Sequence, residues 1–168
     1  MLKTPEIYPA NTASFNELLK FAKTILGLCR KLKLKPIVYG SLAYFFHTKD
    51  STLPVNDLDL LISEAAFPNL IKLLDKQKKN LDYKVMPYHS LEVYKEDLKI
   101  DLDSIEHFLY PRPSKAIKAR IGGLDFNIIN LEALIDIYCE ALENMPRIKK
   151  LDKKRVLYTR KLDNLRKL

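Results

Sequence analysis

The stretch Asn56-Asp57-Leu58-Asp59-Leu60-Leu61-Ile62 decides the fold prediction, because it places two aspartates inside a run otherwise suited to burial. Aspartate is depleted in β-strands, so its presence here requires a reason. Side chains two apart in a strand point the same way, so Asp57 and Asp59 share one face while Leu58 and Leu60 pack on the other. Two carboxylates this close repel each other unless a cation lies between them, and a hard ion such as Mg²⁺ suits them.

A second acidic segment, Leu98 to Asp103, also alternates between apolar and charged residues. The alternation predicts a strand with its apolar side chains toward the core and with Asp101 and Asp103 on the opposite face. Either acid could complete a site for two metal ions about 3.5 to 4 Å apart. We favour Asp101, which lies deeper in the strand, and Asp103 stays the alternative.

Upstream of both segments, the short apolar run Ile37 to Tyr39 ends at Gly40-Ser41, which predicts a buried strand and a tight turn into a helix. Free backbone amides and the helix dipole at such a turn attract phosphate, and the serine hydroxyl adds a donor. A Gly-Ser pair after a strand is also typical of a plain turn. Thr48 to Pro54 is polar and is expected to be a loop.

The remaining pattern predicts an α/β domain in which strands and helices alternate. The N-terminal region predicts a helix from Ser14, with Ser14 and Glu17 as a capping box. Asn130 is expected to cap a helix that ends at Pro146. Further elements are expected at Pro68 to Gln77 (helix), at Tyr83 to Met86 and Leu91 to Tyr94 (strands), and at Ile117 to Ile121 and Leu124 to Ile128 (a hairpin around Gly122-Gly123).

The net charge of +8 is local to the C-terminus. Residues 147–168 hold ten basic and two acidic residues, whose difference is the whole excess, and residues 1–146 are balanced at 19 and 19. This tail predicts a last helix whose apolar face docks on the body while its lysines and arginines face outward. Such a basic face could bind the phosphates of RNA, DNA or a triphosphate, or could serve only as a solvated helix face.

Other residue types indicate little chemistry. Cys29 and Cys139 match no metal-ligand spacing and are expected to be buried thiols. No stretch approaches the roughly 20 apolar residues that span a bilayer, so we expect a cytoplasmic protein without a membrane partner. The three histidines show no ligand spacing and receive no role. Tyr88-His89 and residues 110–113 could border a substrate pocket or be ordinary loops.

Taken together, Tyr39-Gly40-Ser41, Asn56 to Leu60 and Ile100 to Leu102 resemble the polymerase-beta-like nucleotidyltransferase superfamily, and in particular its small single-domain members. The resemblance covers about Ile37 to Asp103. It implies a mixed β-sheet flanked by helices, with further helices at the C-terminus. One departure is the gap of fifteen residues between Ser41 and Asp57, where Thr48 to Pro54 is expected to be an insertion.

Carried to these positions, the resemblance implies that Gly40 and Ser41 hold the triphosphate of ATP or another NTP. It implies that Asp57 and Asp59 bind two Mg²⁺ ions and the nucleotide. Asp101 would share the metals and assist deprotonation of the acceptor. No basic residue is assigned to the triphosphate.

We therefore expect a catalytic domain over residues 1–146, with the basic helix of residues 147–168 packed on it. The expected reaction is metal-dependent transfer of a nucleoside monophosphate to an acceptor, with release of pyrophosphate. The resemblance spans acceptors among small molecules, RNA and proteins, and the basic tail tilts the expectation toward RNA. The competing hypothesis is a catalytically inactive binding module for nucleic acid or a partner protein.

Overall fold

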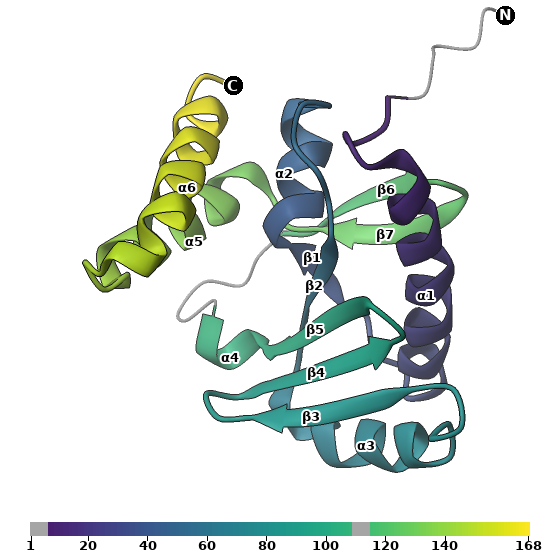
Figure 1. Ribbon diagram of the computed structural model, residues 1–168. Coiled ribbons are helices and arrows are strands. Elements are labelled where there is room, and N and C mark those ends of the chain that lie inside the picture. The colour runs from purple at the N-terminus through teal and green to yellow at the C-terminus, as the bar shows by residue number, and fades with distance from the viewer. Residues whose placement is uncertain (1–6, 109–114) are drawn as a thin grey trace, which may run out of the picture.

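The computed structural model describes residues 7–108 and 115–168, and its centre is a seven-stranded mixed sheet in the order β3-β4-β5-β2-β1-β7-β6 (Figure 1). The pairs β2–β5 and β1–β7 are parallel, and the other pairs are antiparallel. The predicted α/β class with a mixed sheet is confirmed. The strands are β1 (Ile37–Tyr39), β2 (Asp57–Ile62), β3 (Asp82–Met86), β4 (Ser90–Lys95), β5 (Leu98–Ser104), β6 (Ile117–Ile121) and β7 (Leu124–Ile128).

The helices form two groups around this sheet. Helix α1 contacts β2, β5 and α3, whereas α5 and α6 pack on each other and on α2. Figure 1 shows the α5–α6 pair beside α2, on the other side of the molecule from α1. The helices are α1 (Thr12–Lys31), α2 (Gly40–Thr48), α3 (Phe67–Asp75), α4 (Ile105–Phe108), α5 (Leu131–Asn144) and α6 (Asp152–Leu165), with 3₁₀ turns at Glu64–Ala66 and Lys149–Leu151.

The predicted alternation places the apolar side chains of the two central strands in the core. Leu58 and Leu60 of β2 are buried, as are Ile100 and Leu102 of β5. The apolar face of α1 covers these strands, since its buried residues recur at helical spacing. The polar positions of β2 and β5 are therefore left on the opposite face of the sheet, where the predicted site residues lie.

The start of α1 differs from the prediction. The helix begins at Thr12 after Asn11, and Ser14 makes no capping bond to the helix backbone amides. Asn11 instead accepts a hydrogen bond from the Val55 amide and donates one to the Val55 carbonyl. The side chain best suited to cap α1 is thus used to fasten the helix to the segment before β2.

Two other local predictions are confirmed. Gly122 and Gly123, both with positive φ, form the turn that pairs β6 with β7. A positive φ suits glycine because it has no Cβ. The Asn130 side chain accepts a hydrogen bond from the Ala133 amide and caps α5.

Cys29 is buried, and burial raises the pKa of its thiol to about 11, which makes it unreactive. Cys139 is only half-buried, so the prediction of two buried thiols is wrong for this residue; the buried residues of its helix α5 are Leu134 and Tyr138. Within the described ranges, no helix is both long and apolar enough to cross a membrane. The possible pocket residues 110–113 lie outside the described ranges.

Candidate active site

An acidic cluster forms where β2 and β5 run side by side. The parallel register places Asp59 opposite Asp101 and Asp57 opposite Lys99. One carboxylate oxygen from each of Asp57, Asp59 and Asp101 lies within 4.8 Å of the other two. The two strands therefore bring together the three acids that are predicted to form one site.

Gly40 is the point where the acidic cluster meets the start of α2. Tyr39, the last residue of β1, pairs with Asp59 across the antiparallel β1–β2 ladder. A Cβ atom added to Gly40 would lie 2.0 Å from Oδ2 of Asp59, and Gly40 has a φ of +65°. Only glycine fits here, because any side chain would collide with the carboxylate and would strain the backbone. The N-terminal turn of α2 is therefore in direct contact with the acids.

Lys99 supplies positive charge to the cluster. Its Nζ atom lies 2.8 Å from Oδ2 of Asp101, 3.7 Å from Oδ2 of Asp57 and 4.0 Å from Oε1 of Glu92. Burial opposes its charged form, but Asp101, Asp57 and Glu92 outweigh this effect and raise the pKa of Lys99. Lys99 therefore remains an ammonium ion between the acids.

The acids still carry more negative charge than this one lysine balances. Burial raises the pKa of the Asp59 carboxyl well above its usual range, and the charges of Asp57 and Asp101 raise it further. Burial also raises the pKa of Asp101, although Lys99 opposes the shift. The cluster therefore favours a bound proton or a bound cation over fully ionised acids.

Asp103, the alternative third acid, lies outside the group of three. It is 4% exposed, and its carboxylate accepts hydrogen bonds from the Tyr39 hydroxyl at 2.5 Å and the Ser90 hydroxyl at 2.5 Å. It lies opposite Leu61 in the β2–β5 register. Burial raises its pKa, and the two hydroxyl groups oppose that shift. Asp103 thus has structural partners of its own, and the register selects Asp101 for the cluster.

Lys161 points inward, so the prediction that the lysines of the tail face outward is wrong for this residue. It is 4% exposed, and its Nζ donates a hydrogen bond to Oγ of Ser41 at 2.9 Å. The same Nζ lies over the rings of Tyr44 and Tyr138, at 5.3 and 5.8 Å from their centroids. Burial lowers the pKa of Lys161, and Asp59 and Asp57 act in the opposite direction. A positive charge from the last helix therefore reaches the predicted phosphate-binding turn.

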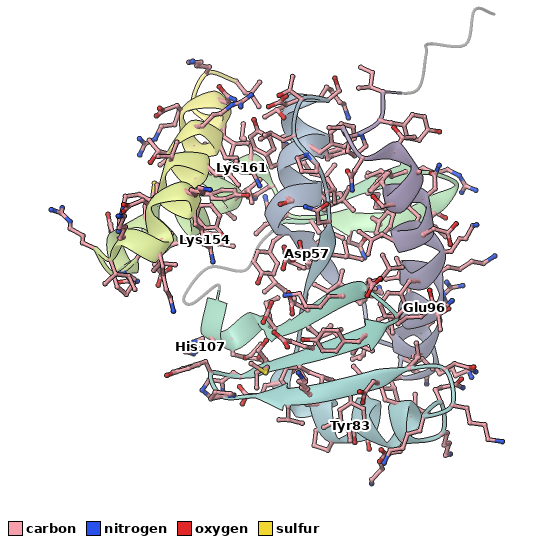
Figure 2. All side chains as sticks on the ribbon, viewed as in Figure 1. Asp57, Tyr83, Glu96, His107, Lys154 and Lys161 are labelled. Atoms are coloured by element: carbon pink, nitrogen blue, oxygen red, sulfur yellow. The ribbon has the colours of Figure 1, made fainter. Side chains whose placement is uncertain are left out.

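Further polar contacts fix α6 against α2 and the loop that follows it. Asn164 donates to the Tyr44 hydroxyl at 2.9 Å, and that hydroxyl donates to Asp50 at 2.7 Å. Arg160 donates to Thr52 at 2.9 Å. Figure 2 shows Lys154 and Lys161 on α6, across from Asp57 on β2. The basic helix thus borders the acidic cluster.

The sequence contained signals for both lysines that were missed. Lys99 stands two residues before Asp101, so the same alternation that grouped the acids also places the lysine on their face. Lys161 stands three residues after Tyr158 and four before Leu165, which is the spacing of the apolar face of α6. A charged residue on an apolar helix face is a signal for a buried contact.

The histidines are outside the acidic cluster, in line with the absence of ligand spacing. His89 Nδ1 lies 2.5 Å from Oε1 of Glu64, and its ring stacks on His107 at 4.7 Å. His47 Nε2 lies 2.8 Å from the Ile129 carbonyl oxygen. Among the described residues, the one group of three or more possible metal ligands is the three aspartates.

No protein-family model matches the chain, and no match to a curated protein is found. Solved structures, in contrast, match over most of its length. The mixed sheet, the strand-to-helix turn at Gly40 and the flanking helices define the polymerase-beta-like nucleotidyltransferase fold, and structural similarity confirms that the chain has this fold.

Three of these structures are the following. ANT(2'')-Ia in complex with adenylyl-2''-tobramycin has a TM-score of 0.59 and 15% identity, over 85% of this chain and 86% of that one. The lincosamide antibiotic adenylyltransferase LnuA with bound lincomycin has a TM-score of 0.55 and 15% identity, over 88% of this chain and 95% of that one. The Megavirus polyadenylate synthase has 0.54 and 16%, over 99% of this chain and 39% of that one.

Proposed function

We propose that this protein is a metal-dependent nucleotidyltransferase that transfers a nucleoside monophosphate from an NTP to an acceptor hydroxyl or phosphate and releases pyrophosphate. The observation that carries the proposal is the convergence of Asp57, Asp59 and Asp101 within 4.8 Å, in contact with the start of α2. The fold supports the same reaction type, because the solved structures that share it include a complex with adenylyl-2''-tobramycin, a lincosamide antibiotic adenylyltransferase and a polyadenylate synthase.

The three aspartates fit the divalent ions that such a reaction uses. They offer carboxylate oxygens, which Mg²⁺ prefers. The pKa values of Asp59 and Asp101 are raised, which indicates that a cation would be favoured beside these carboxylates. Asp57, Asp59 and Asp101 would hold two Mg²⁺ ions between them. Bound Mg²⁺ would neutralise charge on the phosphates and on the acceptor oxygen.

The triphosphate is proposed to lie at the N-terminus of α2. The first backbone amides of this nine-residue helix, which include those of Gly40 and Ser41, have no acceptor within the helix, and no acidic side chain occupies its first turn. Lys161, 2.9 Å from the Ser41 hydroxyl, would transfer its hydrogen bond to a phosphate oxygen and would balance part of the charge. The missing basic ligand of the triphosphate is thus assigned to the last helix.

The aspartates would divide the remaining work. Asp57 and Asp59 share one face of β2, and the Gly40 contact holds Asp59 in one position, so both would orient the α-phosphorus for attack. Asp101 is proposed to accept the proton of the acceptor, since burial raises its pKa and makes it a stronger base. Catalysis would depend mainly on positioning and charge neutralisation.

RNA is the proposed acceptor. Of the ten basic residues in 147–168, eight are exposed, Arg155 is half-buried and Lys161 is buried. This exposed charge lies on the segment that carries Lys161 to the site, and it would attract a polyanion and repel a polycation. We propose residues 1–146 as the catalytic part and residues 147–168 as the helix that binds the acceptor and completes the triphosphate site.

The test is pyrophosphate release from each labelled NTP with Mg²⁺, in the presence of short RNA and of small-molecule acceptors. The parent protein is expected to release pyrophosphate, and the Asp57→Asn/Asp59→Asn variant is not. If the parent binds neither Mg²⁺ nor nucleotide but binds RNA, the inactive binding module replaces the enzyme. RNA affinity that does not weaken as salt rises would contradict phosphate contacts by the tail.

A further inference from the structure

Lys99 lies where it competes with a divalent ion for the same oxygens. Its ammonium contacts Oδ2 of Asp101 at 2.8 Å and Oδ2 of Asp57 at 3.7 Å, so it bridges two of the three proposed metal ligands. Its side chain is 32% exposed, compared with 14% for Asp101. In this arrangement the lysine is the cation of the site.

The sheet explains why the lysine is there. Strand β5 lies between β2 and β4, with Lys99 opposite Asp57 on one side and with Asp101 opposite Glu92 on the other. Lys99 and Asp101 are two residues apart and share a face. An amine on this position can therefore reach an acid on its own strand and on each neighbouring strand.

The ammonium and a divalent ion cannot both have these contacts. A divalent ion needs the lone pairs of Asp57 and Asp101 that now face the ammonium, and its charge repels the lysine at short range. Glu92 gives the lysine another place to go, since its Oε1 lies 4.0 Å from Nζ and its side chain is 19% exposed. Glu92 also accepts a hydrogen bond from the Tyr94 hydroxyl, which fixes this second acid in position.

We infer that Lys99 is an internal counter-ion that holds Asp57 and Asp101 together in the metal-free protein and is displaced toward Glu92 when a divalent ion binds. Lys99 is thus a positioning residue that weakens ion binding in the absence of nucleotide. The triphosphate brings negative charge, which offsets the repulsion and couples ion binding to nucleotide binding. This inference rests on the proposed function, because it requires Asp57 and Asp101 to be metal ligands.

The experiment measures Mn²⁺ affinity by electron paramagnetic resonance, with and without a non-hydrolysable triphosphate analogue. Lys99→Met is expected to bind Mn²⁺ on the order of tenfold more tightly than the parent without the analogue, because the competing charge is gone. The analogue should strengthen Mn²⁺ binding less in this variant than in the parent. Lys99→Arg keeps the charge and should stay near the parent.

Lys118→Met is the matched control, since Lys118 is an exposed strand lysine on β6, at the far end of the sheet from β4 and β5. It should bind Mn²⁺ like the parent. Thermal unfolding checks the fold of each variant. In chelator, Lys99→Met should unfold at a lower temperature than the parent, and Mn²⁺ should stabilise it more. If Lys99 had a purely structural role, Lys99→Met would lower the unfolding temperature by the same amount in chelator and in Mn²⁺.

The outcomes separate the two proposals. If the parent binds Mn²⁺ at the aspartates and Lys99→Met binds it equally or more weakly, the role of Lys99 is overturned and the proposed function stands. If neither protein binds Mn²⁺, with or without the analogue, the metal site is absent and both proposals fail. If Lys99→Met and Lys118→Met both bound Mn²⁺ more tightly than the parent, the loss of one positive charge anywhere on the protein would explain the result, and the inference would also be overturned.

Discussion

Strand β5 carries two similar acids in different surroundings. Asp101, the middle residue of the strand, is half-buried and lies with Lys99 and the two acids of β2. Asp103, in the second half, is buried and accepts hydrogen bonds from Tyr39 and Ser90. Both side chains lie on the same face of the strand, so alternation alone does not distinguish them.

The difference comes from the neighbouring strands. The β2–β5 register places Asp59 opposite Asp101 and an apolar residue, Leu61, opposite Asp103. The β4–β5 register places Ser90 opposite Asp103. One acid is therefore surrounded by like charges and the other by hydroxyl donors. A carboxylate among other carboxylates suits a cation, and a carboxylate among donors is already satisfied.

The largest expected effect separates the two acids by activity. Asp101→Asn should lower the rate of pyrophosphate release by on the order of 10²–10³-fold, as the loss of one electrostatic contact to a transition state does. Asp103→Asn should retain most of the activity, because Asp103 is not one of the three proposed metal ligands. Steady-state rates at saturating NTP and Mg²⁺ check this. Equal losses in both variants would remove the distinction.

The next effect tests the contact between Asp59, the partner of Asp101, and the start of α2. Gly40→Ala should abolish most activity and lower the free energy of unfolding by about 1–3 kcal/mol, because the new Cβ overlaps Oδ2 of Asp59. Gly123→Ala is the control, with a φ of +80° but no atom within 4 Å of the added Cβ. It should cost only the backbone strain, about 1–2 kcal/mol, with activity unchanged. Chemical unfolding and activity assays measure both.

A stability change should identify the role of Asp103. Asp103→Asn should lower the free energy of unfolding by about 1–3 kcal/mol, because Tyr39 and Ser90 donate to different carboxylate oxygens and the amide replaces one of these acceptors with a donor. Asp125→Asn is the matched change in an exposed ion pair with Arg120 and should cost about 0–1 kcal/mol. Urea unfolding measures both. A cost for Asp103→Asn no larger than that of the control would contradict the structural role.

The smallest effect concerns pH in the metal-free protein. The pKa of Asp59 is raised in the fold, so its contribution to stability is fully present below the unfolded value of about 3.9 and is lost as pH rises through the folded value. Asp59→Asn should therefore gain stability relative to the parent as pH rises. Asp103→Asn should show a trend of the same sign, because burial raises the pKa of Asp103 as well. Thermal unfolding in chelator across pH 4–8 measures the trend. If the stability of Asp59→Asn relative to the parent fell as pH rose, the prediction would be contradicted.

The sequence predicts most local features of this protein, with the Ser14–Glu17 capping box as an exception. The alternation in Asp57–Ile62 and Leu98–Ser104 gives both strands and the face of their acids, because one face must be buried. The glycine pair gives the β6–β7 turn and Asn130 gives the α5 cap, because both depend on residues close in sequence. The convergence of the acids is expected both from this alternation and from the resemblance.

The features that sequence did not give depend on distant neighbours. The sequence favours Asp101 and leaves Asp103 as the alternative, whereas the register with β2 and β4, which no local pattern fixes, gives the two acids their different partners. The inward direction of Lys161 follows from how α6 packs on α2, since 120 residues separate the lysine from Ser41. The need for glycine at position 40 follows from the position of the Asp59 carboxylate.

The central claim is that three aspartates on two adjacent strands hold divalent ions beside a triphosphate at the start of α2. A crystal structure with Mn²⁺ and a non-hydrolysable NTP analogue tests it most directly, since Mn²⁺ can be located by its anomalous scattering. We expect Mn²⁺ to be bound by Asp57, Asp59 and Asp101, with phosphates at Gly40, Ser41 and Lys161. Mn²⁺ and the analogue bound elsewhere, with the three carboxylates left to Lys99, would contradict it.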